Sequence, residues 1–238
     1  MHINARKKNR KYRRMSIKKR VISCLIVLLL LGFVCIIGYK QQDYIAAMGQ
    51  IEEGQKKIAL TFDDGPHPYY TEQLLDGLKE RGVKATFFVT GEHATLHPEV
   101  IERMSEEGHL IGNHTYSHMQ LGNSNREAFK EELIRTNEVI EEITGKEVVY
   151  VRPPYGSWDK EFETELNMFP VLWTVDPLDW CSDNVDSITG KVLSKVKEND
   201  IILMHDYYPS TVTAALQVVD ELQEQGYEFV TVEEILFD

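Results

Sequence analysis

Short apolar runs typical of buried strands alternate with amphipathic segments typical of helices over most of this 238-residue chain, and that alternation restricts its fold severely. The predicted strands lie at residues 57–62, 85–89, 110–111, 148–151, 171–175, 201–204 and 229–232. The predicted helices lie at residues 71–81, 98–107, 126–144, 187–196 and 212–225. Such alternation is typical of α/β proteins in which helices cover a mostly parallel sheet, so we expect either a barrel or an open sheet.

A segment of a different kind precedes this region. Residues 21–38 are eighteen residues without a charge, and as a helix they would span roughly 27 Å, enough for the hydrocarbon core of a bilayer. Ten of the 26 Lys and Arg residues lie among the first 20 residues, which contain no acid. The positive-inside rule therefore leaves this tail in the cytoplasm and the remainder outside the cell. We expect an uncleaved single-pass membrane anchor; a cleaved signal peptide, which would give a secreted protein, is the alternative.

The sequence thus predicts a basic tail at 1–20, a transmembrane anchor at 21–39, a linker at 40–55 and one folded domain at 56–238. Because ten basic residues belong to the tail, the rest of the chain has 16 basic and 38 acidic residues, a net charge of −22. This charge excludes a nucleic-acid-binding domain, since phosphate contacts need a basic face. Cys24 and Cys35 lie in the apolar run, which leaves Cys181 alone in the exported part, so no intrachain disulfide is expected there.

Two polar clusters suggest a metal site. Asp63 and Asp64 directly follow the first predicted strand, and adjacent carboxylates repel each other unless a cation or a proton intervenes. His114 and His118 are four residues apart, so that in a helix both imidazoles would lie on one face and could chelate one ion. Two His and one Asp leave a coordination position open for water, which is typical of catalytic metals. A polar turn and a pair of surface histidines are the alternative interpretations.

Three further clusters follow predicted strands. Residues 152–156 read RPPYG, a rigid loop that could hold a backbone N–H where an oxyanion forms. Residues 176–180 read DPLDW and residues 203–206 read LMHD. Taken alone, Asp179 would be a surface acid and His205 a structural histidine. In a barrel of parallel strands, however, chemistry collects at the carboxyl ends of the strands, where all these clusters fall.

The five clusters, TFDDGP, HTYSH, RPPYG, DPLDW and LMHD, resemble in identity and order the five motifs of the polysaccharide deacetylases of carbohydrate esterase family 4, which share the NodB homology domain. The resemblance covers about residues 56–238 and implies that this part is the catalytic domain. It implies a distorted (β/α) barrel with fewer than eight units. It also implies a divalent metal, most commonly zinc, with cobalt or another divalent ion as an alternative.

The resemblance assigns a role to each matching residue. The implied metal ligands are Asp64, His114 and His118. Asp63 would be the general base and His205 the general acid, oriented by Arg152 and Asp179 respectively. The backbone N–H of Tyr155 would help to hold the oxyanion. The implied walls of the substrate pocket are Pro153, Trp180 and Leu203.

The implied reaction is hydrolysis of an N-acetyl group on a sugar, giving acetate and an amine. A linker of about 17 residues reaches at most roughly 60 Å, which favours a glycan close to the membrane, and peptidoglycan N-acetylglucosamine is the leading candidate. Chitin-like oligomers, secreted poly-N-acetylglucosamine, acetylated xylan and a glycan-binding role without catalysis are the alternatives; protein partners are unknown. Tyr69, Tyr70 and Trp158 could stack on sugar rings or serve in packing.

Overall fold

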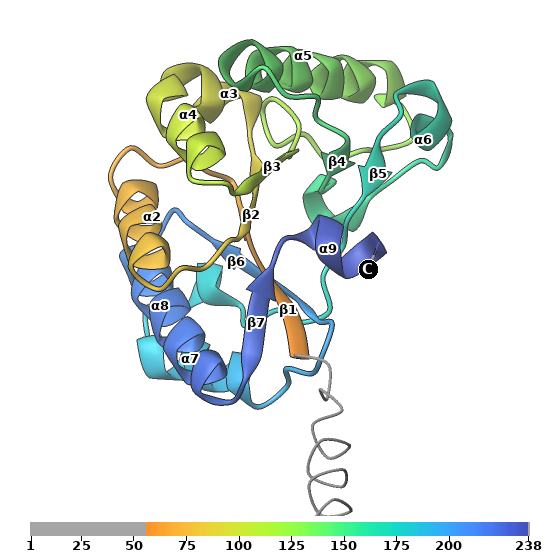
Figure 1. The fold of residues 1–238 in the computed structure, drawn as a ribbon. Coiled ribbons are helices and arrows are strands. Elements are labelled where there is room, and N and C mark those ends of the chain that lie inside the picture. The colour runs from red at the N-terminus through yellow and green to blue at the C-terminus, as the bar shows by residue number, and fades with distance from the viewer. Residues whose placement is uncertain (1–55, 238) are drawn as a thin grey trace, which may run out of the picture. The chain divides into compact units, whose positions relative to one another are not determined.

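The computed structural model describes residues 56–237, and its centre is a parallel sheet of seven strands. The strands are β1 (Lys56–Asp63), β2 (Thr86–Val89), β3 (Leu110–Asn113), β4 (Tyr150–Val151), β5 (Phe169–Pro170), β6 (Ile201–His205) and β7 (Tyr227–Val230). Their order is β5-β4-β3-β2-β1-β6, and β7 pairs with the first half of β1 on the edge that β2 occupies further along (Figure 1). All pairings are parallel, as the strand–helix alternation predicts.

The sheet curls so that its two ends approach each other. After β5 the chain turns back to β6, where Val175 forms a parallel bridge with Ile202. The N–H of Leu203 donates to the carbonyl of Val175, and the N–H of Val175 donates to the carbonyl of Ile201. This curled parallel sheet agrees with the expected distorted barrel of fewer than eight units.

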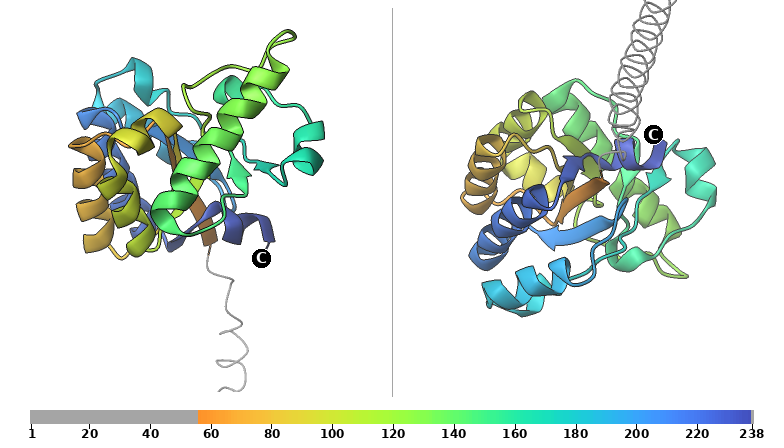
Figure 2. Two further views of the ribbon diagram at one scale, coloured as in Figure 1. Left: turned by 90° about the horizontal axis from the view of Figure 1, so that it is seen from above. Right: turned by 60° about the horizontal axis from the view of Figure 1, so that its bottom comes forward.

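Helices surround the sheet (Figure 2). They are α2 (Tyr70–Glu80), α3 (Gly91–Leu96), α4 (Pro98–Glu106), α5 (Arg126–Thr144), α6 (Glu161–Glu165), α7 (Val185–Leu193), α8 (Pro209–Glu224) and α9 (Val232–Phe237). Most cover the outside of the sheet, whereas α9 packs Val232 against the interior cluster of Ala59. The five predicted helices correspond to α2, α4, α5, α7 and α8. The three that the sequence analysis missed have only five or six residues each, too few to show a helical repeat of apolar positions.

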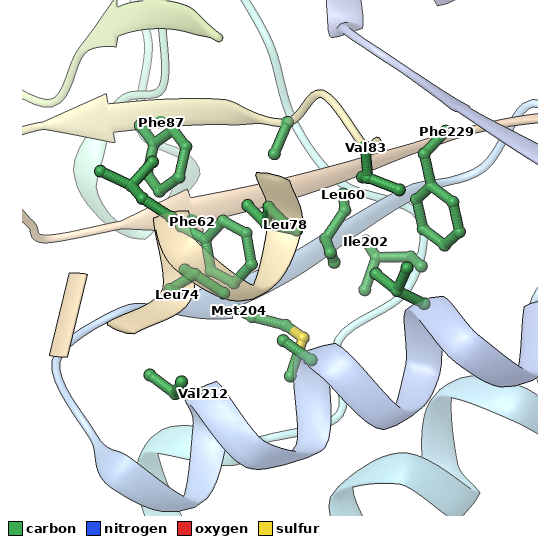
Figure 3. Packing of buried hydrophobic residues seen from close by; sticks show 14 of the residues in the cluster. Leu60, Phe62, Leu74, Leu78, Val83, Phe87, Ile202, Met204, Val212 and Phe229 are labelled. Carbon is green, nitrogen blue, oxygen red and sulfur yellow. The ribbon is translucent and has the colours of Figure 1, made fainter. Parts of the chain in front are cut away.

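Alternate residues of the central strands face two separate apolar layers. Leu60 and Phe62 of β1 pack outward with Leu74 and Leu78 of α2 and with Met204 of β6 (Figure 3). Side chains of the opposite parity face the barrel interior, where Ala59 belongs to a second cluster. Because both faces of β1 are buried, its sequence is a continuous apolar run rather than an alternating one. The interior parity also brings Asp63 and His205 to one end of the barrel.

Three predicted strands differ from the observed ones. The last, predicted at 229–232, is β7 at Tyr227–Val230, and Val232 already belongs to α9. The predicted strand at 171–175 is wrong: β5 lies at Phe169–Pro170, and of residues 171–175 only Val175 forms a bridge. Leu172 is exposed there, so an apolar run was not sufficient evidence for a strand. The predicted strand at 148–151 is reduced to β4, Tyr150–Val151.

The predicted membrane anchor at 21–39, the basic tail and the linker lie outside the described residues. Within residues 56–237, no helix has both the length and the apolar character that crossing a bilayer would need.

The packing between β1 and α2 leads to a test of stability. We expect Leu78→Ala to lower the free energy of unfolding by about 2–5 kcal/mol, because a fully buried side chain is lost and a cavity remains. Leu96→Ala is the matched control, because Leu96 is 62% exposed, and it should change that free energy by less than about 0.5 kcal/mol. Urea titrations of both variants measure the difference, and equal losses would contradict this view of the core.

Candidate active site

A cavity of about 600 Å³ opens at the carboxyl ends of the strands. Its lining residues include every predicted site residue except the two orienting ones, Arg152 and Asp179, which lie behind it. The lining is Asp63, Asp64, His114, His118, Pro153, Tyr155, Trp173, Asp176, Trp180, Leu203, His205 and Tyr208. The structure therefore brings residues from five separate segments of the sequence into one place.

Three of these residues form a cluster with the geometry of a metal site. One ligand atom from each of Asp64, His114 and His118 lies within 4.8 Å of the others. The Oδ1 atom of Asp64 is 3.4 Å from Nε2 of His114 and 3.4 Å from Nε2 of His118. That oxygen is buried and has no hydrogen-bond partner, which is costly unless a cation completes the site. These three side chains fit a divalent ion with room for a further ligand.

The two histidines lie in a loop and not in a helix. Residues 114–118 are not helical: Thr115 and His118 have φ of 61° and 58°, in the left-handed region. Side chains hold this loop, because the N–H of Thr115 donates to Oδ1 of Asn113 and the N–H of Met119 donates to Oγ1 of Thr115. A helix would place both rings on one face, but here the two rings meet in a loop, with centroids 4.9 Å apart.

Hydrogen bonds and charges prepare the cluster for a cation. Nδ1 of His114 donates to the carbonyl oxygen of Arg152 at 2.5 Å, which leaves Nε2 of His114 free to bind a metal. Burial raises the pKa of Asp64, but its interactions with His114, and the charges of His205 and His118, outweigh burial and lower the pKa to about 2. Burial, together with His114, lowers the pKa of His118. An ionised carboxylate and neutral imidazoles are the forms that bind metals.

Asp63 lies against a fully buried guanidinium. Nη1 of Arg152 donates to Oδ1 of Asp63 at 2.8 Å and to Oγ1 of Thr61 at 2.6 Å. Nε of Arg152 donates to the carbonyl of Val171 at 3.0 Å, and its guanidinium lies over the ring of Phe88. Burial lowers the pKa of Arg152, and Asp63 opposes that shift. Arg152 therefore fixes both the rotamer and the charge environment of Asp63, in the place that the resemblance implies.

His205 forms a second pair with Asp179. Its Nδ1 lies 2.9 Å from Oδ1 of Asp179, and its backbone N–H donates to Oδ2 of Asp179 at 2.8 Å. Burial lowers the pKa of His205, but Asp179 and the charges of Asp63 and Asp64 raise it to about 9. The raised pKa favours the protonated imidazole, the form that a general acid needs. Oγ1 of Thr211, in α8, also donates to Oδ2 of Asp179 at 2.8 Å. Nothing in the sequence indicated this contact.

The remaining predicted residues form the walls and the rim. Tyr155 lies in the short turn Pro154–Gly156 with φ of 58°, and its ring contacts that of His118 at 5.1 Å between centroids. Pro153, Trp180 and Leu203 line the cavity. The lining also includes Trp173, Asp176 and Tyr208, which the sequence analysis did not single out because flanking aromatic and acidic residues are common beside any loop.

The three aromatic residues considered for sugar stacking are not in the cavity lining. Trp158 packs against Phe162 in the apolar cluster beneath α5, so packing is its observed role. Tyr70 stacks on His67 with ring centroids 4.4 Å apart. Tyr69 is 60% exposed and lies outside the cavity.

Asp206 follows His205 and is fully buried, and the sequence pattern did not predict a role for it. Burial raises its pKa to about 7, against the hydrogen bond from Thr71. Oγ1 of Thr71 donates to Oδ2 of Asp206 at 2.5 Å. A Cβ atom on Gly65 would lie 2.3 Å from that oxygen, so only glycine allows the loop after β1 to pass this close to Asp206.

A family model described as polysaccharide deacetylase matches residues 50–171. Peptidoglycan-N-acetylmuramic acid deacetylase PdaC of Bacillus subtilis is 41% identical over 186 residues, which are 78% of this chain and 40% of PdaC. This chain thus spans less than half of that relative. A peptidoglycan-N-acetylglucosamine deacetylase of Bacillus cereus is 39% identical over 195 residues, 79% of this chain and 91% of the relative.

Solved structures share the fold. The structure of PdaC superposes with a TM-score of 0.74 at 39% identity, covering 78% of this chain and 92% of that structure. A family 4 acetyl xylan esterase from Clostridium thermocellum, solved with a cobalt ion, has a TM-score of 0.70 at 33% identity and covers 76% of this chain and 90% of its own. The chain belongs to the polysaccharide deacetylase family, as its five motifs predicted.

Proposed function

We propose that this protein is a metal-dependent hydrolase that removes N-acetyl groups from peptidoglycan N-acetylglucosamine and releases acetate. The observation that carries the proposal is the meeting in one cavity of a candidate metal cluster, the carboxylate of Asp63 and the imidazole of His205, which is paired with Asp179. An amide is a poor electrophile and an amine a poor leaving group, so its hydrolysis needs help at both ends. This cavity offers Asp63 as a base for the attacking water and His205 as an acid for the leaving nitrogen.

Asp64, His114 and His118 would hold the ion, and we infer zinc because imidazole and carboxylate ligands with an open position suit it. A divalent ion bound there supplies Lewis acidity and lowers the pKa of water towards about 7. Cobalt remains an alternative ion, since the Clostridium thermocellum relative was solved with it.

The other residues of the chain move and orient protons. Asp63, held by Arg152 at 2.8 Å, would accept the proton of the attacking water. His205, held by Asp179 at 2.9 Å, would donate a proton to the departing nitrogen. Each such transfer is typically worth about 10²–10⁴-fold in rate. The backbone N–H of Tyr155 would stabilise the oxyanion, while Trp180 and Leu203 would enclose the acetyl methyl group.

The names of the relatives support a cell-wall substrate. The Bacillus cereus relative is named for N-acetylglucosamine and PdaC for N-acetylmuramic acid, both in peptidoglycan. We favour N-acetylglucosamine, on a glycan at the outer face of the membrane to which residues 21–39 would anchor the domain. In that case the protein is a single-pass membrane enzyme with its catalytic domain outside the cell.

A side-by-side assay tests the proposal. The full chain, offered peptidoglycan, chitooligosaccharide and acetylated xylan at matched acetyl content, should release acetate fastest from peptidoglycan and expose glucosamine amines there. Preference for acetylated xylan would make the protein an esterase. Glycan binding without acetate release from any of the three would contradict catalysis altogether.

The pair of His205 and Asp179 predicts a specific pH dependence. Because the pKa of His205 is raised to about 9, the protonated acid is present below that pH, and kcat/KM should fall as pH rises through it. Asp179→Asn removes the charge that raises this pKa, so the alkaline limb of the pH profile should move to lower pH. Asp183→Asn, the same change at an exposed position nearby, should leave the limb in place. An unmoved limb in Asp179→Asn would remove His205 from the acid role.

A further inference from the structure

His93, in the first turn of α3, contacts the backbone of a candidate metal ligand. Its Nδ1 lies 2.7 Å from the carbonyl oxygen of Asp64. A carbonyl oxygen can only accept, so Nδ1 must carry the hydrogen in this bond. None of the five motifs contains His93, and the ring does not line the cavity.

The backbone that receives this bond has an unusual conformation. Asp64 has φ of 74°, in the left-handed region that L-residues rarely adopt. A residue held there depends on the surrounding structure to keep it in place. The carbonyl of the next residue, Gly65, accepts from the N–H of Thr90 at 3.1 Å. Two donors from the start of α3 therefore hold two consecutive carbonyls of the loop after β1.

His93 is itself fixed from two sides. Its backbone N–H donates to Oγ1 of Thr90, the N-cap of α3. Its ring stacks on Tyr207, with centroids 5.4 Å apart and planes 26° apart. Tyr207 follows His205 by two residues, and its ring also meets the edge of His67 at 4.8 Å. The imidazole thus joins the loop that carries Asp64 to the loop that follows the candidate acid.

We propose that His93 is a positioning residue for the metal site. By donating to the carbonyl of Asp64, it holds this residue in the conformation in which Oδ1 faces the imidazoles of His114 and His118. The proposal rests on the metal role of Asp64 proposed above. A partner that orients a metal ligand typically changes metal affinity about 10–100-fold when it is removed.

Two substitutions separate this hydrogen bond from simple packing. His93→Phe keeps a ring to stack on Tyr207 but has no donor. His93→Asn loses the ring, yet its amide nitrogen is the same number of bonds from the backbone as Nδ1 and can donate to the same carbonyl. If the bond matters, His93→Phe should weaken zinc binding about 10–100-fold, while His93→Asn should bind close to wild type. If only packing matters, the order of the two variants is reversed.

The measurement is a zinc titration of the metal-free full chain against a chromophoric chelator, which requires no substrate. His97→Phe is the matched control, since the ring of His97 lies beside Glu99, 3.8 Å away, and it should leave affinity unchanged. Wild-type affinity in His93→Phe, or equal losses in both His93 variants, would overturn the proposal. If circular dichroism shows His93→Phe to be unfolded, His93→Ala replaces it in the comparison with His93→Asn. Failure of the wild type to bind zinc or cobalt would instead refute the metal role proposed for Asp64.

Discussion

The parallel register between β1 and β6 is the constraint on which the rest of the site depends. In this ladder Asp63 is the partner of His205, so the candidate base and the candidate acid end neighbouring strands at the same level. Each side chain has the interior parity of its strand, and therefore both face the cavity. A similar pairing of Asn113 with Val151 aligns the loops that follow β3 and β4. A shift of one residue in one of these ladders would turn one member of its pair to the other face of the sheet.

The site also contains buried charged side chains. Arg152 is fully buried, and desolvation of a guanidinium is tolerable only because Asp63, Thr61 and two backbone carbonyls accept its hydrogen bonds. Removing one partner of a buried ion pair typically costs about 3–5 kcal/mol, since the other charge is left unpaired. Asp179 likewise stabilises the charged form of the partly buried imidazole of His205. Stability and chemistry at this site therefore depend on the same contacts.

The sequence located site residues correctly where a buried strand is followed directly by a polar motif. The apolar run before Asp63 and Asp64 placed these residues at a strand end. The family resemblance then predicted that they share a site with His114 and His118. Prediction from the sequence failed where tertiary contacts decide the backbone. Residues 114–118 form a loop in which Oδ1 of Asn113 accepts from the N–H of Thr115. Residues 171–175 leave the expected strand while carbonyls 171 and 172 accept from Arg152. The contact between His93 and Asp64 joins segments 29 residues apart, and no spacing rule indicates it.

Central to the proposed chemistry is one cavity that would hold both a cation and a separate acid. Bound metal and acetate release, measured on the same preparations of the wild type, His114→Ala and His205→Ala, test this most directly. His114→Ala should lose metal and activity together, because it removes a ligand. His205→Ala should keep its metal and lose nearly all turnover, because the leaving nitrogen is no longer protonated. Full metal occupancy in His114→Ala, or normal turnover in His205→Ala, would contradict the account.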